Sequence, residues 1–233
     1  MSQPERRHMF QGNLSHSMRE NYSFGVDKYY EAVALTYRNP SYGAIRTMLW
    51  NALTQFYARE KPTPFKVLDL AAGAGEASTV LLEWFTACQQ RKGSRRLTVT
   101  PIDPTLSPPE IVATDAFTEP AFREAHPTIP FHALNFQQTG EIPESGFDLC
   151  IISFALHLVA TSSELWTCLD ALSRKCRWLL IISPHKKPDI KNHVWGWSRW
   201  DMATWEQDAG DASEVVQERV RGRWYKSNHR GDY

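Results

Sequence analysis

Short apolar runs alternate with stretches of helical periodicity through the middle of the chain. Four runs bounded by prolines, glycines or charged residues predict buried strands, at residues 65–70, 131–136, 147–154 and 178–183. Residues 76–90 and 165–172 place apolar side chains three or four positions apart, which predicts helices. Strands that alternate with helices in this way predict a doubly wound α/β fold with a mainly parallel sheet.

The segment before the first predicted strand has helical periodicity of its own. Apolar and aromatic residues recur at helical spacing over residues 29–57, and the proline-rich residues 61–64 read as a linker. We therefore expect a tail and helical cap over residues 1–62. An α/β domain with a Trp-rich C-terminal segment is expected over residues 63–233.

Aromatic residues gather in both of these parts. Four tyrosines lie between residues 22 and 37 and a predicted helix over residues 190–206 contains four tryptophans: Tyr22, Tyr29, Tyr30, Tyr37, Trp195, Trp197, Trp200 and Trp205. One interpretation is a lid over a flat, apolar or cationic ligand. The alternative is that these side chains pack the core of their own segment.

Two interpretations stay open between the first helix and residue 125. Leu97 to Ile102 predicts a strand that ends at Asp103, and Ser107-Pro108-Pro109-Glu110 then resembles a helix start. Alternatively, Ile111 to Thr114 forms the strand, which ends at Asp115 and is followed by a helix up to Ala125. The spacing of apolar residues does not choose between them.

Composition limits the kinds of protein that the chain represents. It has 233 residues, with 26 Lys and Arg against 26 Asp and Glu, so its net charge of zero argues against a general nucleic-acid binder. Its four cysteines form no C-x-x-C pair and are expected to be buried free thiols. No apolar run is long enough for a membrane span, and no secretory signal is visible, so a soluble, cytoplasmic protein is expected. The histidines have no metal-ligand spacing, and we expect no metal site.

The segment VLDLAAGAGE, residues 67–76, carries the clearest chemical signal. It predicts a strand, a tight turn and the start of a helix, where glycines let the backbone approach a ligand and the helix presents free N–H groups. A dinucleotide fingerprint needs a third glycine, but Ser78 stands at that position. The fingerprint also has no counterpart of Asp69, which stands four residues before Gly73.

The pattern D-x-x-x-G-x-G resembles motif I of the class I S-adenosylmethionine-dependent methyltransferases, and the chain resembles small fungal members of that superfamily. The resemblance implies S-adenosyl-L-methionine as cofactor. It implies that the loop holds the methionine end of this donor, through Asp69, Ala71, Gly73 and Gly75.

The same resemblance implies contacts for the rest of the donor. An acidic residue that ends the second strand binds the ribose hydroxyls, and both Asp103 and Asp115 qualify. Asn135 and Phe136, at the end of the next predicted strand, would contact adenine. Asn135 departs from the acidic residue that many members have there.

The segment FDLCIISFALHL, residues 147–158, resembles motif IV of the superfamily. The resemblance places Ser153 and Phe154 beside the donor and makes His157 the candidate catalytic base. A histidine between two leucines is more often a hydrogen-bonded structural residue.

The C-terminal end departs from the family, whose domains have seven strands. Residues 215–225 form one last strand candidate, broken at Gly222, so the seventh strand is expected to be missing. The resulting open sheet edge would need cover from a homodimer or a partner protein.

The resemblance implies methyl transfer from S-adenosylmethionine to an O-, N- or S-nucleophile of a small molecule, with a role in fungal secondary metabolism. The alternatives are a non-catalytic, methyltransferase-like protein that binds a partner protein, and a nucleotide-binding oxidoreductase.

Overall fold

The computed structural model describes residues 39, 41–184, 187–188, 190, 193–208, 214–217 and 219–229. The elements follow one another in this order: α3 (Tyr42–Glu60), β1 (Lys66–Leu70), α4 (Glu76–Gln89), β2 (Glu110–Thr114), α5 (Glu119–Ala125), β3 (Phe131–His132), η2 (Phe136–Glu141), β4 (Phe147–Ser153), η3 (Leu156–Leu158), α6 (Ser162–Lys175), β5 (Cys176–Ser183), β6 (Trp197–Asp201), β7 (Glu206–Gln207), β8 (Val215–Gln217) and β9 (Val220–Ser227). The tyrosines that were expected to form a lid lie outside the described residues.

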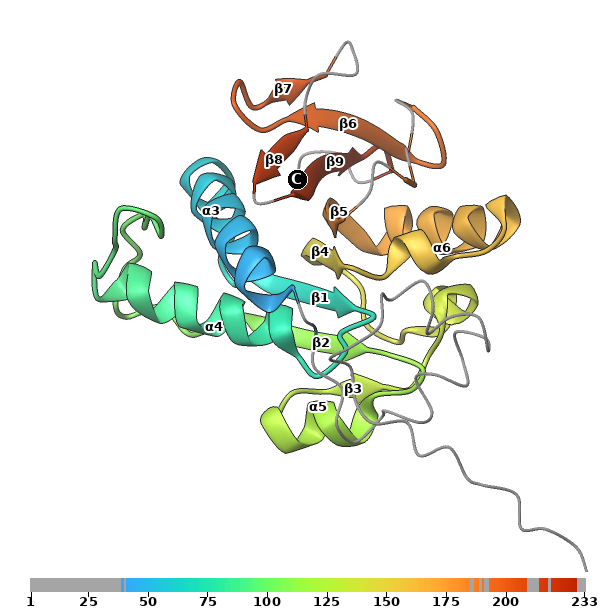
Figure 1. Ribbon diagram of the computed structural model, residues 1–233, viewed down its shortest axis with the longest axis horizontal. Coiled ribbons are helices and arrows are strands. Elements are labelled where there is room, and N and C mark those ends of the chain that lie inside the picture. The colour runs from blue at the N-terminus through green and yellow to red at the C-terminus, as the bar shows by residue number, and fades with distance from the viewer. Residues whose placement is uncertain are drawn as a thin grey trace, which may run out of the picture.

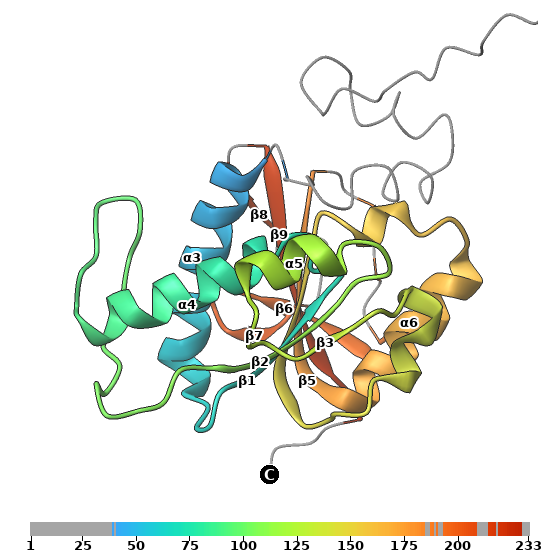
Figure 2. The ribbon, with the colours of Figure 1, turned by 90° about the horizontal axis from the view of Figure 1, so that it is seen from below.

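These strands form one mixed sheet in the order β3-β2-β1-β4-β5-β9-β6-β7, with β8 paired to β9. Strands β1 to β5 are parallel to one another, whereas β9 runs antiparallel to both β5 and β6. The helices cover both faces, with α3 and α4 on one side and α6 on the other (Figures 1 and 2). The doubly wound α/β fold that the sequence predicts is confirmed.

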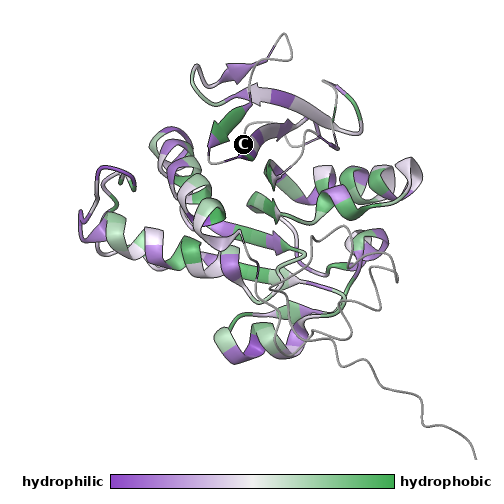
Figure 3. Ribbon diagram, viewed as in Figure 1, coloured by the Kyte–Doolittle hydropathy of each residue, from purple (hydrophilic) through white to green (hydrophobic). Residues whose placement is uncertain are grey.

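Alternating side chains of the central strands fill two cores. Val67 and Ile151 belong to the core under α3 and α4, whereas Leu68 and Ile152 belong to the core under α6. Hydrophobic residues accordingly dominate the central strands in Figure 3, while polar positions alternate with them along the helices. All four cysteines are buried and unpaired, as expected.

Helix α3 packs into the main core rather than standing apart from it. Eight of its residues are buried, among them Ile45, Leu49 and Phe56, and they share one core with α4 and the sheet. The expected division of the chain at residue 62 stays a prediction. The described part of the N-terminal segment nevertheless depends on the sheet for its packing.

The missing seventh strand is a wrong prediction, and so is the helix over residues 190–206. Residues 215–225 form two strands, β8 and most of β9, and β9 occupies the position beside β5. Gly222 lies within β9, and the chain turns between Gln217 and Val220 instead. The Trp-rich segment contributes strand β6, on the far side of β9.

The strand expected at residues 97–102 is also wrong, as is the helix start at Ser107. The segment is a long loop fixed to α3, because the Trp50 indole and the Thr54 hydroxyl both donate to the Thr98 carbonyl oxygen. Glu110 begins β2, where its N–H donates to the Phe65 carbonyl oxygen. Strand β3 covers two residues of the expected 131–136, and the rest leads into η2.

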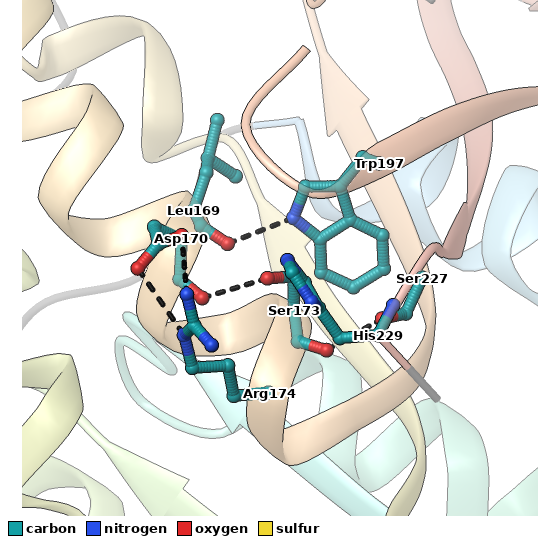
Figure 4. A network of polar contacts seen from close by, with 7 residues as sticks. All are labelled: Leu169, Asp170, Ser173, Arg174, Trp197, Ser227 and His229. Carbon is teal, nitrogen blue, oxygen red and sulfur yellow. Dashed lines mark hydrogen bonds and ion pairs between the residues drawn. The ribbon is translucent and has the colours of Figure 1, made fainter. Parts of the chain in front are cut away.

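The C-terminal strands are attached to the end of α6 by side-chain hydrogen bonds (Figure 4). The Trp197 indole donates to the Leu169 carbonyl oxygen at 2.9 Å, and the Ser227 hydroxyl donates to the Ser173 carbonyl oxygen. The Ser227 hydroxyl also accepts the N–H of His229. The Ser173 carbonyl group, in the final turn of α6, therefore takes its partner from β9, while β6 contacts the turn before it.

Candidate functional site

A cavity of about 700 Å³ opens at the carboxyl ends of β1, β2 and β4. Its described walls come from the loop after each of these strands, from η2, and from the turn before α6: Leu70, Ala71, Gly73, Thr114, Asp115, Ala116, Phe117, Ala133, Leu134, Asn135, Phe136, Gln137, Gln138, Ser153, Phe154, Ala155, Leu158, Val159, Ala160 and Glu164. This is the position where open α/β sheets bind ligands.

The loop after β1 turns sharply through left-handed backbone. Gly73 and Gly75 have φ values of 60° and 86°, which glycine adopts at little cost. Gly75 does not line the cavity, and a Cβ atom there would lie 2.3 Å from the His126 ring. Gly75 therefore permits close packing of α4 against the end of α5, while Gly73 belongs to the wall.

Carboxylates already accept hydrogen bonds from the backbone of this loop. The Gly73 N–H donates to Asp115 and the Ala74 N–H donates to Glu76, both at 3.1 Å. The Ser78 N–H donates to Asp69 at 3.0 Å. The expectation that the start of the helix presents free N–H groups is therefore wrong at these three positions.

Asp69 lies beneath the loop and is not part of the cavity wall. One of its oxygens accepts hydrogen bonds from both the N–H and the hydroxyl of Ser78, which joins β1 to the first turn of α4. Burial raises the pKa of Asp69 to about 7, and the nearby negative charges of Glu76 and Asp115 also raise it. The hydrogen bonds from Ser78 act in the opposite direction.

Of the two acidic candidates, Asp115 lines the cavity and Asp103 lies far from it. Asp115 follows β2 directly and accepts hydrogen bonds from the N–H groups of Phe117 and Thr118. The Asp103 carbonyl oxygen instead accepts the side chain of Gln89, at the last residue of α4. Helix α4 is 14 residues long, so this end is about 20 Å from the glycine loop.

Asn135 and Phe136 both line the cavity, at the start of η2. The Asn135 side chain caps this short helix by accepting the N–H groups of Gln137 and Gln138. The Gln137 amide donates to Glu164 at 2.7 Å, which links η2 to the first turn of α6. This hydrogen bond lies at the cavity wall, because both residues belong to it.

The carboxyl end of β4 supplies Ser153 and Phe154 to the wall. Phe154 has a left-handed backbone, with φ of 56°, and its N–H donates to the Ile182 carbonyl oxygen at 2.8 Å. His157 lies in η3, between wall residues Ala155 and Leu158, but is not itself among the described wall residues. The structure thus does not bring the candidate base to the cavity.

The tryptophans of the C-terminal segment pack far from this cavity. Trp200, Trp205 and Trp224 each contact Trp178 of β5, and Phe56 of α3 stacks on Trp224 with ring centroids 5.3 Å apart. They fill the core beside β5 and β9. The lid interpretation is therefore wrong for Trp200 and Trp205, and packing within the core is correct.

Sequence reasoning missed three polar residues at this site: Thr114, Glu76 and Glu164. Thr114 is fully buried, and its hydroxyl has no hydrogen-bond partner among the described residues. Glu76 accepts the N–H of Asn39 as well as that of Ala74. Glu164 was detectable, because Thr161 and Glu164 stand at the spacing of a capping box, which the structure contains.

Acidic side chains give the site a negative charge. Among the described wall residues, the charged side chains are Asp115 and Glu164, and Glu76 lies next to the loop. A bound pyrophosphate needs free N–H groups or cationic side chains. The arrangement instead suits a ligand that carries positive charge.

Comparisons with known proteins found similarity in both sequence and structure. No family model matches the chain. The uncharacterized protein C17A5.05c of Schizosaccharomyces pombe is 38% identical over 237 residues, which cover 93% of this chain and 94% of the relative.

Two solved structures share the fold at low sequence identity. The mitomycin 7-O-methyltransferase MmcR has a TM-score of 0.52 and 12% identity over 89% of this chain. The DszA carbon methyltransferase has a TM-score of 0.50 and 13% identity over 85% of this chain. The chain spans 60% and 57% of these two proteins. The chain therefore belongs to the same family as C17A5.05c of S. pombe, and its domain has the fold of class I S-adenosylmethionine-dependent methyltransferases.

Proposed function

We propose that this protein transfers a methyl group from S-adenosylmethionine to a small molecule. The observation that carries the proposal is the pair of carboxylates at the glycine loop, where Glu76 and Asp115 accept N–H groups that a phosphate would otherwise need. Negative charge at this loop favours a cationic donor and disfavours a dinucleotide. It also counts against the oxidoreductase alternative.

The proposed donor has a place for each of its parts. Gly73 and Ala71 would hold the methionine end, and Asp115, which is in the cavity wall, would accept a ribose hydroxyl. Asn135 and Phe136 offer a polar group and an aromatic face to adenine. The cavity volume of about 700 Å³ is within the range of small-molecule sites.

When bound, the donor supplies a methyl carbon that its sulfonium activates toward nucleophiles. The protein then has to align the acceptor with that carbon and exclude water. Ser153 and Phe154, at the end of β4, are the proposed contacts beside the reacting methyl group. We assign no proton transfer to His157, because its side chain is not among the described wall residues.

The nature of the acceptor is part of the proposal. The cavity volume suits a small-molecule acceptor, and a role in secondary metabolism remains part of the proposal. The fold hosts both oxygen and carbon methylation, so it does not select the acceptor atom. Within the described part of the chain, no helix is both long and apolar enough to cross a membrane.

Calorimetry with S-adenosylmethionine and S-adenosylhomocysteine tests the proposal directly. We expect Asp115→Asn to weaken binding of both ligands, because the amide replaces an acceptor oxygen at the wall with a donor. Asp103→Asn is the matched control and should bind like the wild type. A wild-type protein that binds neither ligand at millimolar concentration would contradict the enzyme proposal and favour the partner-binding alternative.

A turnover assay then separates binding from catalysis. Labelled S-adenosylmethionine is incubated with acceptors that offer a phenol, an amine, a thiol or an activated carbon. Methyl transfer to one class identifies the nucleophile. Donor binding without transfer to any extract of small molecules would favour a non-catalytic role.

A further inference from the structure

Thr114 carries a buried hydroxyl group that no described residue satisfies. The residue ends β2, has a relative exposure of 0%, and belongs to the cavity wall. Its Oγ1 atom has no hydrogen-bond partner, although its carbonyl oxygen accepts the Ala72 N–H at 2.9 Å. A buried hydroxyl without a partner costs folding free energy, so its presence at a cavity needs an explanation.

Two other buried threonines near the same loops do satisfy their hydroxyl groups. The Thr118 hydroxyl donates to the Gly73 carbonyl oxygen, and the Thr139 hydroxyl donates to the Phe136 carbonyl oxygen, both at 2.7 Å. Both residues are fully buried, like Thr114. The exception is therefore the threonine that lines the cavity, which points to a partner that enters from the cavity.

The neighbouring Asp115 has little capacity left for a nucleoside. It accepts three backbone N–H groups, from Phe117, Thr118 and Gly73. A carboxylate has about four acceptor positions, so roughly one remains. The two adjacent hydroxyls of a ribose need more than this, and an additional polar group is required beside Asp115.

We propose that the Thr114 hydroxyl binds the adenosine part of the methyl donor, next to Asp115. Thr114 pairs with Leu70 of β1 and with His132 of β3, so it lies between the glycine loop and the segment that leads to Asn135. A hydroxyl both donates and accepts, which suits a ribose oxygen or a ring nitrogen of adenine. This inference rests on the proposed function.

The test compares Thr114→Val with Thr139→Val in the full chain. Valine has nearly the shape of threonine and lacks the hydroxyl. We measure dissociation constants for S-adenosylhomocysteine and for 5′-methylthioadenosine, which retains adenosine and lacks the amino acid. The midpoint of thermal unfolding of the ligand-free protein is the second readout.

Thr114→Val should weaken both ligands by a similar factor, about 3- to 10-fold for one hydrogen bond. It should also raise the unfolding midpoint, because it removes an unsatisfied group. Thr139→Val should lower the midpoint and leave both dissociation constants unchanged.

The inference is overturned if Thr114→Val binds both ligands like the wild type, or if it loses affinity for S-adenosylhomocysteine alone. Failure of the proposed function looks different, because the wild type would then bind neither ligand.

Discussion

Backbone strain marks two residues at the ends of neighbouring strands. Ala71 after β1 and Phe154 after β4 have φ values of 57° and 56°, although neither is a glycine, and both line the cavity. Left-handed backbone costs such residues about 1–2 kcal/mol, and strain of this kind concentrates at functional sites. The spacing of Gly73 and Gly75 predicted a tight turn, but nothing in the sequence showed that Ala71 shares the strained conformation.

Replacing Ala71 with glycine tests this strain. Glycine relieves the left-handed penalty and adds a similar entropic cost, so Ala71→Gly should stay within about 0.5 kcal/mol of the wild type. Ala72→Gly is the matched control, since Ala72 is buried and is not among the residues with positive φ. It should lose about 1 kcal/mol or more in urea unfolding. Equal losses at both positions would argue against strain at Ala71.

Asp69 makes stability depend on pH. Its pKa is about 7 in the folded protein, against about 3.9 in an unfolded chain. Between these values the folded state keeps the proton while the unfolded state loses it. The stabilising contribution is therefore complete below pH 4 and is lost as the pH rises to about 7.

Asp69→Asn removes this dependence and keeps an acceptor for Ser78. At pH 8 the variant should be more stable than the wild type, and the difference should fall by up to about 1.4 kcal/mol per pH unit toward pH 4. Chemical unfolding at several pH values measures this, with Asp103→Asn as an exposed control. A variant less stable than the wild type at pH 8 would mean that the charged form is the one the fold favours.

At the scale of elements, the sequence predicted what local patterns determine. Continuous apolar runs identified β1, β4 and β5, because these strands are buried on both faces. The segment over residues 197–201 was misread, since Trp197 and Trp200 stand three residues apart, as in a helix. Pairing with β9, more than twenty residues later in sequence, makes it a strand. Residues 97–102 were misread as a strand. They form a loop, because Trp50 and Thr54 donate hydrogen bonds to the Thr98 carbonyl oxygen.

The link between β9 and α6 provides a prediction at this scale. Ser227→Ala removes the donor to the buried Ser173 carbonyl oxygen, which belongs to the last turn of α6 and then lacks that partner (Figure 4). The loss should be about 1–3 kcal/mol in urea unfolding. The control Thr167→Ala removes an exposed hydroxyl that bonds within the helix, and it should change stability by less than about 0.5 kcal/mol. A similarly small loss of stability in both variants would show that water donates to the Ser173 carbonyl oxygen when the Ser227 hydroxyl is absent.

At the scale of the molecule, the architecture of the sheet could be predicted in part. The alternation of strands and helices predicted the parallel half of the sheet, and the family resemblance predicted the cavity at its carboxyl edge. Neither identified the residues that complete the site through distant contacts, such as Thr114 and the Gln137–Glu164 pair. Such pairs depend on the relative placement of whole elements, which local periodicity does not encode.

Removing the last hairpin tests how far the sheet depends on it. A chain that ends at residue 213 lacks β8 and β9, so β5 and β6 lose their shared neighbour. We expect it to lack cooperative unfolding and to aggregate, because Trp178 and Phe56 lose their contacts with Trp224. Adding a peptide of residues 214–233 should restore part of the native circular dichroism. A cooperative transition without the peptide would mean that the remaining sheet is stable alone.

The position of β9 also affects how the protein is made. Translation delivers the chain from its N-terminus, so β5 and β6 leave the ribosome while the strand that joins them is still being synthesised. Each then presents an unpaired edge, and a nascent chain with such edges is prone to aggregation. The sheet therefore closes only once β9 has been synthesised, and until then the facing edges of β5 and β6 stay exposed.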